Sequence, residues 1–218
     1  MSTTSYQRRQ TPASKRAPVK RKSRFGCVLT LIIIAVLTGA LIIGAVRVNR
    51  YLSETSVFNN GRISKAVQLY EPDIAQAAAA NGIPDYVLIL EAMMMQESKG
   101  RGGDPMQASE SHYNTEYPKK VGGITDPKYS IQVGVAFFAD LLEKAECTSP
   151  NDTNNLLLAI QGYNFGDNYI VWARENYGGY SVENARVYSQ IMEQEMGWES
   201  YGDPEYAASV MKYVEANR

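Results

Sequence analysis

A single acidic residue ends a strongly apolar stretch near the middle of the chain. The sequence VLILEAMMMQESKG, residues 87–100, places Glu97 two positions after three consecutive methionines. A carboxyl group held against apolar side chains is harder to ionise than one in water, so its pKa rises. A carboxyl group that keeps its proton near neutral pH can act as a general acid. The stretch therefore nominates Glu97 for proton transfer.

Glu91 is a second candidate in the same stretch. Four residues share one face of an ideal helix, within an arc of about 80°: Val87, Leu90, Met94 and Glu97. Glu91 lies at the edge of this arc, and either glutamate could also be an ordinary acid that reaches solvent. The glycine-rich run that follows Glu97 is a common way to open a cleft, whereas Glu91 lies two turns earlier. This context favours Glu97.

Metal and disulfide chemistry have little support in this chain. It contains one histidine and two cysteines, too few to draw a metal cluster with the usual ligand spacing. His112 is interpreted as a surface or loop residue. Cys27 and Cys147 are expected on different sides of the membrane boundary described below, so they cannot pair within the chain. We expect no metal ion and no other cofactor.

The charge of the first fifty residues differs sharply from that of the rest. Residues 1–50 hold 10 of the 22 Lys and Arg residues and none of the 23 acids, so residues 51–218 carry 12 basic and 23 acidic groups. The overall charge of −1 therefore hides a basic segment and an acidic one with a net charge of −11. Such an acidic segment is not expected to bind nucleic acid.

An uncharged run of twenty residues, 27–46, lies inside the basic segment. As a helix it would span about 30 Å, the thickness of a bilayer core. Most of the flanking basic residues precede it, so the N-terminus is expected in the cytoplasm and the acidic segment outside. A cleavable signal peptide is the alternative, but its apolar part is usually shorter, and no small-x-small site is evident before Arg47.

This pattern predicts a single-pass protein of the cell membrane with four parts. They are a basic, disordered cytoplasmic tail (1–26), a transmembrane helix (27–46), a linker (47–64) and an outer domain facing the cell wall (65–218).

Signals for helix starts and ends dominate the outer domain. Pro72 and Pro84 are typical of first helical turns, and Asn81-Gly82 is typical of a helix end. Further helix starts are expected near Asp126, Asp152, Ser181 and Asp203. No run alternates apolar and polar residues long enough to indicate a sheet. The outer domain is therefore predicted to be all-α.

Two motifs, in this order, resemble those of the goose-type lysozyme and soluble lytic transglycosylase clan. They are MMMQESKGRGGDPMQASES, residues 93–111, and AIQGYNFG, residues 159–166. In that clan a Glu-Ser pair at a helix end precedes a Met-Gln turn and a later Tyr-Asn-x-Gly motif. Within it, residues 65–200 are most similar to CwlT-like lysozyme domains, which are bacterial cell-wall lytic modules on a membrane anchor. Met106 follows Glu97 by only nine positions, which favours this branch.

The resemblance implies a lysozyme-like helical fold and cleavage of the β-1,4 bond between N-acetylmuramic acid and N-acetylglucosamine in peptidoglycan. The matching glutamate, Glu97, would be the general acid. The residues that would contact the substrate or position the acid are Ser98, Met106, Gln107, Tyr163, Asn164 and, on a looser match, Tyr188.

The resemblance leaves two reactions open. A hydrolase (muramidase) usually needs a second carboxylate, whereas a lytic transglycosylase uses the sugar's own 6-hydroxyl. The candidate second carboxylates are Asp104, Glu110 and Asp126.

Two alternatives to an enzyme also remain. The domain could be a non-catalytic cell-wall-binding or scaffolding module of an envelope complex, such as a secretion or conjugation machine, or a membrane-tethered signalling partner. The expected partners are peptidoglycan glycan strands and, through residues 27–46, the cell membrane.

Overall fold

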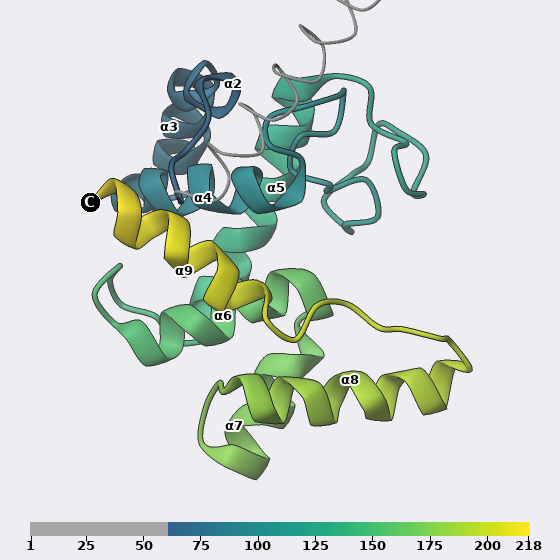
Figure 1. Ribbon diagram of the computed structural model, residues 1–218. Coiled ribbons are helices and arrows are strands. Elements are labelled where there is room, and N and C mark those ends of the chain that lie inside the picture. The colour runs from purple at the N-terminus through teal and green to yellow at the C-terminus, as the bar shows by residue number, and fades with distance from the viewer. Residues whose placement is uncertain (1–60) are drawn as a thin grey trace, which may run out of the picture. The chain divides into compact units, whose positions relative to one another are not determined.

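The computed structural model describes residues 61–218 (Figure 1). Its helices are α2 (Lys65–Gln68), α3 (Glu71–Ala80), the 3-10 turn η1 (Pro84–Tyr86), α4 (Val87–Glu97), α5 (Pro127–Lys144), α6 (Thr153–Phe165), α7 (Asn168–Tyr177), α8 (Val182–Met196) and α9 (Tyr206–Asn217). No residue between 61 and 218 forms a strand, which confirms the prediction of an all-α domain. The segment predicted to cross the membrane, 27–46, lies outside the described residues. Within 61–218, no helix is long and apolar enough to cross a membrane.

The core is built around α4 and α5. Met93, Met94 and Met95 of α4 are fully buried, because this helix is packed on several sides and so can be apolar nearly all round. α4 packs against α3 and α9, while α5 packs against α3 and α6. The methionines thus lie in the interior, and Glu97 is at the C-terminal end of α4.

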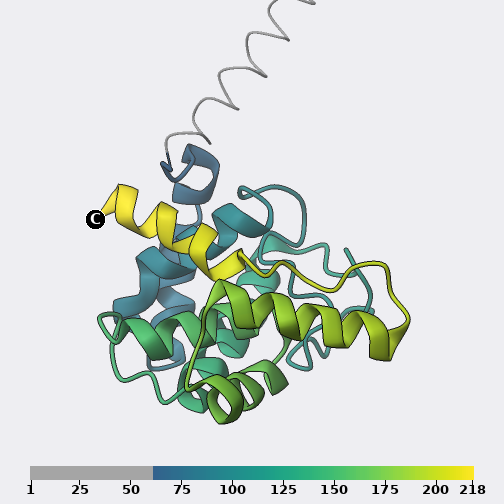
Figure 2. The same ribbon diagram turned by 60° about the horizontal axis from the view of Figure 1, so that its bottom comes forward.

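The last helix, α9, lies across α4 and also packs against α6 (Figures 1 and 2). Its apolar positions Tyr206, Val210 and Val214 are buried at helical spacing. At its other end, the Asn217 amide donates to the Gly61 carbonyl (2.9 Å) and accepts from the Ile63 N–H (3.3 Å). α9 is therefore bound both to the core and to the first described residues.

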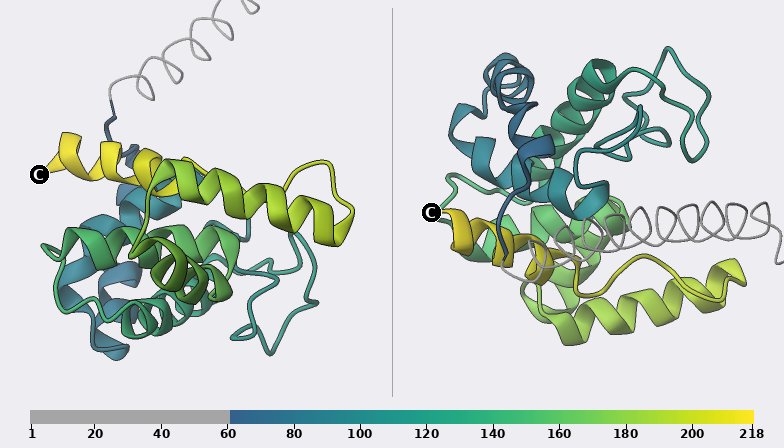
Figure 3. Two further views of the ribbon diagram at one scale, coloured as in Figure 1. Left: turned by 90° about the horizontal axis from the view of Figure 1, so that it is seen from below. Right: turned by 45° about the horizontal axis from the view of Figure 1, so that its top comes forward.

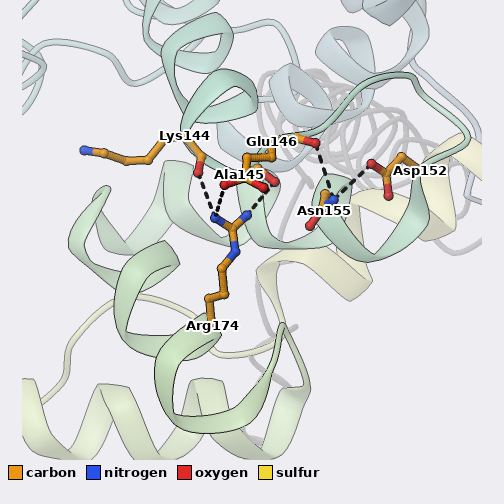
Figure 4. Close-up of polar contacts among 6 residues, drawn as sticks. All are labelled: Lys144, Ala145, Glu146, Asp152, Asn155 and Arg174. Carbon is orange, nitrogen blue, oxygen red and sulfur yellow. Dashed lines mark hydrogen bonds and ion pairs between the residues drawn. The ribbon is translucent and has the colours of Figure 1, made fainter.

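The end of α5 is tied to α7 by an arginine (Figure 4). The Arg174 guanidinium donates to the carbonyl of Ala145 (2.7 Å) and to the carboxylate of Glu146 (3.2 Å). It also reaches the Lys144 carbonyl (3.4 Å). A cation at a helix C-terminus satisfies free carbonyls and opposes the negative end of the helix dipole. This contact fixes α7 on the core.

Between α4 and α5 the chain runs for almost thirty residues, 98–126, without a helix or a strand (teal in Figure 3). A second irregular segment, residues 197–205, joins α8 to α9. Both segments pack against elements that carry predicted functional residues.

The predicted helix starts agree with the structure to within a few residues. Asp126 caps α5 by accepting from the Lys128 N–H (3.0 Å), and Ser181 opens α8 with a capping box. Asp152 precedes α6, but its side chain accepts from Asn155 Nδ2 (3.0 Å) and makes no cap bond. The last helix begins at Tyr206 and not directly after Asp203-Pro204, because the Asp203 carbonyl first accepts the Tyr206 N–H (3.1 Å) in a turn.

Candidate active site

Glu97 is the last residue of α4, at the point where the chain turns sharply. The N–H groups of Ser98 and Lys99 both donate to the Met94 carbonyl (3.1 and 3.0 Å), which closes the helix. Lys99 and Gly100 then adopt left-handed backbone conformations, with φ of 61° and 75°. A Cβ at Gly100 would lie 2.9 Å from backbone atoms of Ala66 and Val67, so only glycine fits there. The turn holds the Glu97 carboxyl at a fixed place beside the core.

A tyrosine from the far end of the chain contacts this carboxyl. The Tyr206 hydroxyl donates to Glu97 Oε1 at 2.5 Å, across 109 residues of sequence. Burial raises the pKa of Glu97 to about 7, and the negative charge of Asp104 adds to the rise, whereas the Tyr206 hydrogen bond opposes it. A carboxyl with its pKa raised in this way can hold its proton near neutral pH, which suits a general acid.

Glu97 lines a cleft with a volume of about 450 Å³. Such a volume is within the range of roughly 300–1,000 Å³ that is common for ligand sites. One group of lining residues, here called the loop side, comes from the segment after α4: Gln107, Ala108, Glu110, Ser111 and His112. The other, here called the helical side, comes from α5, α6 and the start of α7: Phe137, Tyr163, Asn164, Gly166 and Asp167.

The loop side is organised by the buried carboxylate of Asp104. Its oxygens accept from the N–H groups of Ala108 (2.9 Å) and Ser109 (3.1 Å), and from the hydroxyls of Ser130 (2.6 Å) and Ser109. Four accepted hydrogen bonds are as many as a carboxylate can take. Because residues 98–126 have no regular ladder to satisfy their N–H groups, this side chain supplies the acceptors.

Ser98 and Met106 hold the segment after α4 in place through their hydrogen bonds. The Ser98 hydroxyl donates to the Pro105 carbonyl (2.7 Å) and accepts from the N–H groups of Gly100 and Arg101. Met106 is fully buried, and its carbonyl accepts the Tyr163 hydroxyl (2.9 Å). Neither residue is among those that line the cleft. Their contacts position the loop side and Tyr163.

Gln107 does line the cleft. Its backbone is left-handed, with φ of 49°, which is uncommon for a residue other than glycine. Its amide nitrogen donates to the Asp104 carbonyl (2.7 Å), which supports this conformation. A local backbone outlier of this kind is frequent at functional sites, where the surroundings fix it.

Tyr163 and Asn164, of the second motif, lie together on the helical side. Burial and the nearby charges of Glu97 and Asp104 raise the pKa of Tyr163 well above its usual value, so this hydroxyl keeps its proton. The side-chain oxygen of Asn164 (Oδ1) accepts from the Asp203 N–H at 2.6 Å. The first motif, which contains Glu97, and the second motif are thus brought to one cleft.

Tyr188 has a different environment from the one that the sequence match implies. It is 6% exposed, and its ring packs against the rings of Phe165, Tyr169, Trp172 and Tyr201. It is not a lining residue of the cleft. The tyrosine that contacts Glu97 is Tyr206, which sequence reasoning missed because α9 follows the motifs and Tyr206 falls on an ordinary core position of that helix.

The three candidate second carboxylates lie in different surroundings. Only Glu110 lines the cleft. Asp104 is buried in the loop network, and Asp126 caps α5. A fourth acid, Asp167, also lines the cleft. Its carboxylate pairs with Lys144, and the hydrogen bond from Lys144 lowers the pKa of Asp167.

Aromatic side chains border the cleft next to Tyr163. The Phe137 ring lies 5.3 Å from the ring of Tyr163 and 5.8 Å from that of His112, measured between ring centroids. His112 is therefore part of the cleft border and not only a loop residue. Within 61–218, no group of three or more His, Cys, Asp or Glu side chains could hold a metal ion.

A family model described as lysozyme-like matches residues 64–197 of this chain. The chain belongs to the lysozyme-like family. This match and the relatives below confirm the resemblance to CwlT-like lysozyme domains. Tyr206 lies after the last residue that the family model matches.

Two curated relatives extend this comparison of the lysozyme-like chain. It is 36% identical over 155 residues to the bifunctional muramidase/DL-endopeptidase CwlT of Bacillus subtilis, covering 71% of this chain and 44% of that protein. It is also 36% identical over 121 residues to the uncharacterized membrane protein YocA of the same organism, covering 56% of this chain and 50% of that protein. The chain thus spans about half the length of these relatives.

A solved structure has a similar fold over part of its length. It is the crystal structure of a lipoprotein-like protein of the NLP/P60 family from Staphylococcus aureus, with a TM-score of 0.59 and 26% sequence identity. The similarity covers 70% of this chain and 54% of that one.

Proposed function

We propose that this chain cleaves the glycan strands of peptidoglycan at the β-1,4 bond between N-acetylmuramic acid and N-acetylglucosamine, with Glu97 as the general acid. The observation that carries the proposal is the Glu97 carboxyl itself, which lines a cleft, has a pKa of about 7 and receives a hydrogen bond from Tyr206. Family membership and the muramidase named among the relatives support the choice of substrate.

In this mechanism the protonated Glu97 donates its proton to the glycosidic oxygen. As the proton leaves, the carboxylate becomes negative, and the Tyr206 hydroxyl stabilises that charge. Gln107 and Asn164 offer amide groups to the saccharide, while the rings of Phe137 and Tyr163 offer apolar faces beside it. These contacts would hold the bond that is cleaved near Glu97.

Glu110 gives a reason to favour hydrolysis. Among the three carboxylates predicted as a possible second acid, it is the one that lines the cleft with Glu97. An ionised Glu110 could activate a water molecule for attack on the anomeric carbon. Without such a group, the 6-hydroxyl of the sugar would attack and give a 1,6-anhydro end.

The test is to incubate the purified full chain with peptidoglycan, count the soluble fragments and weigh them. Glu97→Gln should lower the rate by about 10²- to 10⁴-fold, because the N–H protons of an amide are far too weakly acidic to be transferred. Glu91→Gln is the matched control: it lies on the same helix, its pKa is also raised by burial, and it does not line the cleft. Near-normal cleavage by Glu97→Gln would overturn the proposal.

The masses separate the reactions. A free reducing end identifies a muramidase, and Glu110→Gln should then slow its formation. A product lighter by one water identifies a lytic transglycosylase. Binding to peptidoglycan with no fragments released from the wild-type chain would identify a wall-binding module instead.

We further propose that residues 27–46 anchor the protein in the cell membrane, with the N-terminus in the cytoplasm and the lysozyme-like domain facing the cell wall. The twenty uncharged residues and the preceding basic residues support this placement. After the cell wall has been removed, protease added outside cells with an intact membrane should digest the domain. Complete protection of the domain until the cells are lysed would contradict this topology.

A further inference from the structure

The hydrogen bond between Tyr206 and Glu97 depends on where α9 begins. Tyr206 is the first residue of that helix and follows an irregular segment, residues 197–205. Glu205, which precedes it, makes no side-chain cap bond. Asp203 accepts the first two N–H groups: its side chain accepts from Glu205 (2.9 Å) and its carbonyl accepts from Tyr206 (3.1 Å). The next N–H groups of the first turn need other partners. The position of the Tyr206 hydroxyl therefore rests in part on contacts made by neighbouring elements.

Gln161 of α6 supplies these contacts. Its side chain is fully buried, and both ends of its amide are used. The nitrogen donates to the Asp203 carbonyl (2.8 Å), and the oxygen accepts from the N–H of Ala207 (3.1 Å). These two partners lie on either side of Tyr206 in the sequence. Gln161 thus bridges the start of α9 and satisfies one of its free N–H groups.

Asn164, three residues further along α6, strengthens the same attachment. Its side-chain oxygen accepts from the Asp203 N–H (2.6 Å). The Tyr201 hydroxyl donates to the Phe165 carbonyl (2.7 Å). The second sequence motif therefore does two things: Tyr163 and Asn164 line the cleft, while Gln161, which does not line it, holds the start of α9.

We propose that Gln161 is a positioning residue that keeps the Tyr206 hydroxyl on the Glu97 carboxyl by bridging Asp203 and Ala207. The inference rests on the proposed function for its kinetic effect, although the geometry it describes does not. The amide offers a donor and an acceptor on two separate atoms of one uncharged side chain. An apolar residue of the same length would leave the buried Ala207 N–H without its acceptor and would remove one of the two hydrogen bonds that the Asp203 carbonyl accepts, so the first turn of α9 would move.

A movement of the first turn of α9 would change the set of groups that face Glu97. They are Tyr206 from α9, Tyr163 from α6 and Asp104 from the loop side. Of these, Tyr206 favours the ionised carboxylate, whereas Asp104 disfavours it. If the start of α9 shifts, Glu97 loses its hydrogen-bond donor and keeps its proton to higher pH. Its proton transfer also slows, because the developing negative charge is no longer stabilised.

The experiment compares Gln161→Met, Tyr206→Phe and the double variant in the full chain. In a cleavage assay on peptidoglycan, each single variant should be slower by roughly tenfold or more, with the alkaline limb of its pH profile moved upward. In the double variant, Gln161→Met should slow cleavage by less than about a further twofold relative to Tyr206→Phe, because the effects of two residues that act through one contact are not additive. Additive losses, or a Gln161→Met profile that coincides with wild type, would overturn the proposal.

Two further variants separate positioning from simple loss of stability. Asn184→Leu removes another buried amide, which accepts from Tyr169 (2.8 Å) and donates to the Gly179 carbonyl (2.7 Å). It should lower the melting temperature but leave the pH profile unchanged. Gln161→Glu keeps the acceptor for Ala207 and regains a donor when its carboxyl is protonated. It should therefore approach wild type at acidic pH and fall behind as pH rises.

A direct titration makes the inference independent of the enzyme assay. The ¹³C resonance of the Glu97 carboxyl, assigned with Glu97→Gln, reports its protonation in the folded chain. Gln161→Met and Tyr206→Phe should raise its midpoint alike, and Asn184→Leu should not. An unchanged midpoint in folded Gln161→Met would overturn the positioning role even if peptidoglycan is cleaved. A wild-type chain that fails to cleave peptidoglycan would refute the proposed function and leave this titration to decide the role of Gln161.

Discussion

The loop side and the helical side of the cleft are held in place over very different lengths of chain. On the loop side, the Asp104 carboxylate bonds to residues at most 26 positions away. On the helical side, Gln161 reaches across 42 positions to Asp203, and Glu97 meets Tyr206 across 109. One side is a locally tied loop, and the other depends on the docking of a distant helix.

The two sides also act on Glu97 in opposite directions. Asp104, which organises the loop side, raises the pKa of Glu97 through its charge, while Tyr206, held from the helical side, lowers it through its hydrogen bond. The acid therefore responds to both sides, and damage to either should have a recognisable signature. Damage to the loop side should mostly affect folding, and damage to the α9 attachment should mostly affect proton transfer.

The largest effect is expected from Asp104→Ala. Four donors lose their acceptor in a buried site, and each unsatisfied buried group costs about 1–3 kcal/mol, so the free energy of unfolding should fall by at least about 3 kcal/mol. Chemical denaturation measures this. Asp126→Ala, which removes only the cap of α5, should cost about 1 kcal/mol. Equal losses in the two variants would mean that the loop side does not depend on Asp104.

The next effect concerns Glu97, whose pKa is influenced from both sides, and the stability of the fold as pH changes. Because the pKa of Glu97 rises from 4.5 to about 7 on folding, the folded protein holds a proton that the unfolded chain releases in this window. The fold therefore loses stability as pH rises from 4.5 to 7, by about 3 kcal/mol in all. Glu97→Gln should remove this loss and be more stable than wild type at pH 8, but not at pH 4. Denaturation midpoints that differ equally at both pH values would contradict the shifted pKa.

Tyr206→Phe tests the contact between α9 and Glu97 alone. The variant keeps the buried ring but removes the hydroxyl, and a hydrogen bond to a charged group contributes about 1.5–3 kcal/mol. Cleavage should therefore slow by about 10- to 100-fold at its best pH, with the alkaline limb of the profile moved upward. A limb that moves downward would show that Tyr206 does not stabilise the carboxylate.

The smallest effect is expected from Tyr188→Phe. Its ring packs in the aromatic cluster with Phe165 and Trp172, and its hydroxyl makes no contact with Glu97. Removing that hydroxyl should change the rate by less than about twofold, since changes away from a reacting group usually have small effects. A loss as large as that of Tyr206→Phe would restore the role that the sequence match suggested for Tyr188.

Local sequence patterns predict most of the fold and part of the site. The prolines, glycines and capping residues predict the helices well, because such signals act within one or two turns. The apolar neighbours nominated both Glu91 and Glu97, and the glycine-rich run after Glu97 favoured Glu97. Gln107, Tyr163 and Asn164 came from the motif resemblance, and all three line the cleft with Glu97.

Other features of the site could not be read from the sequence. Ser98 and Met106 belong to the motif, but only the folded loop shows that they bond to the backbone and to Tyr163. Tyr206 looks like a core residue of its helix, and a contact over 109 positions leaves no local pattern. The family model ends at residue 197, so similarity to that model did not point to Tyr206 either.

The position of Tyr206 also sets the order in which the site can be assembled. A ribosome produces both sequence motifs well before it reaches α9, so the growing chain contains Glu97 long before the hydroxyl that binds it. A chain cut between residues 166 and 206 would still carry every residue of the motifs, yet its acid would lack this partner. The contact between Glu97 and Tyr206 therefore forms late in synthesis, when α9 docks on α4 and α6.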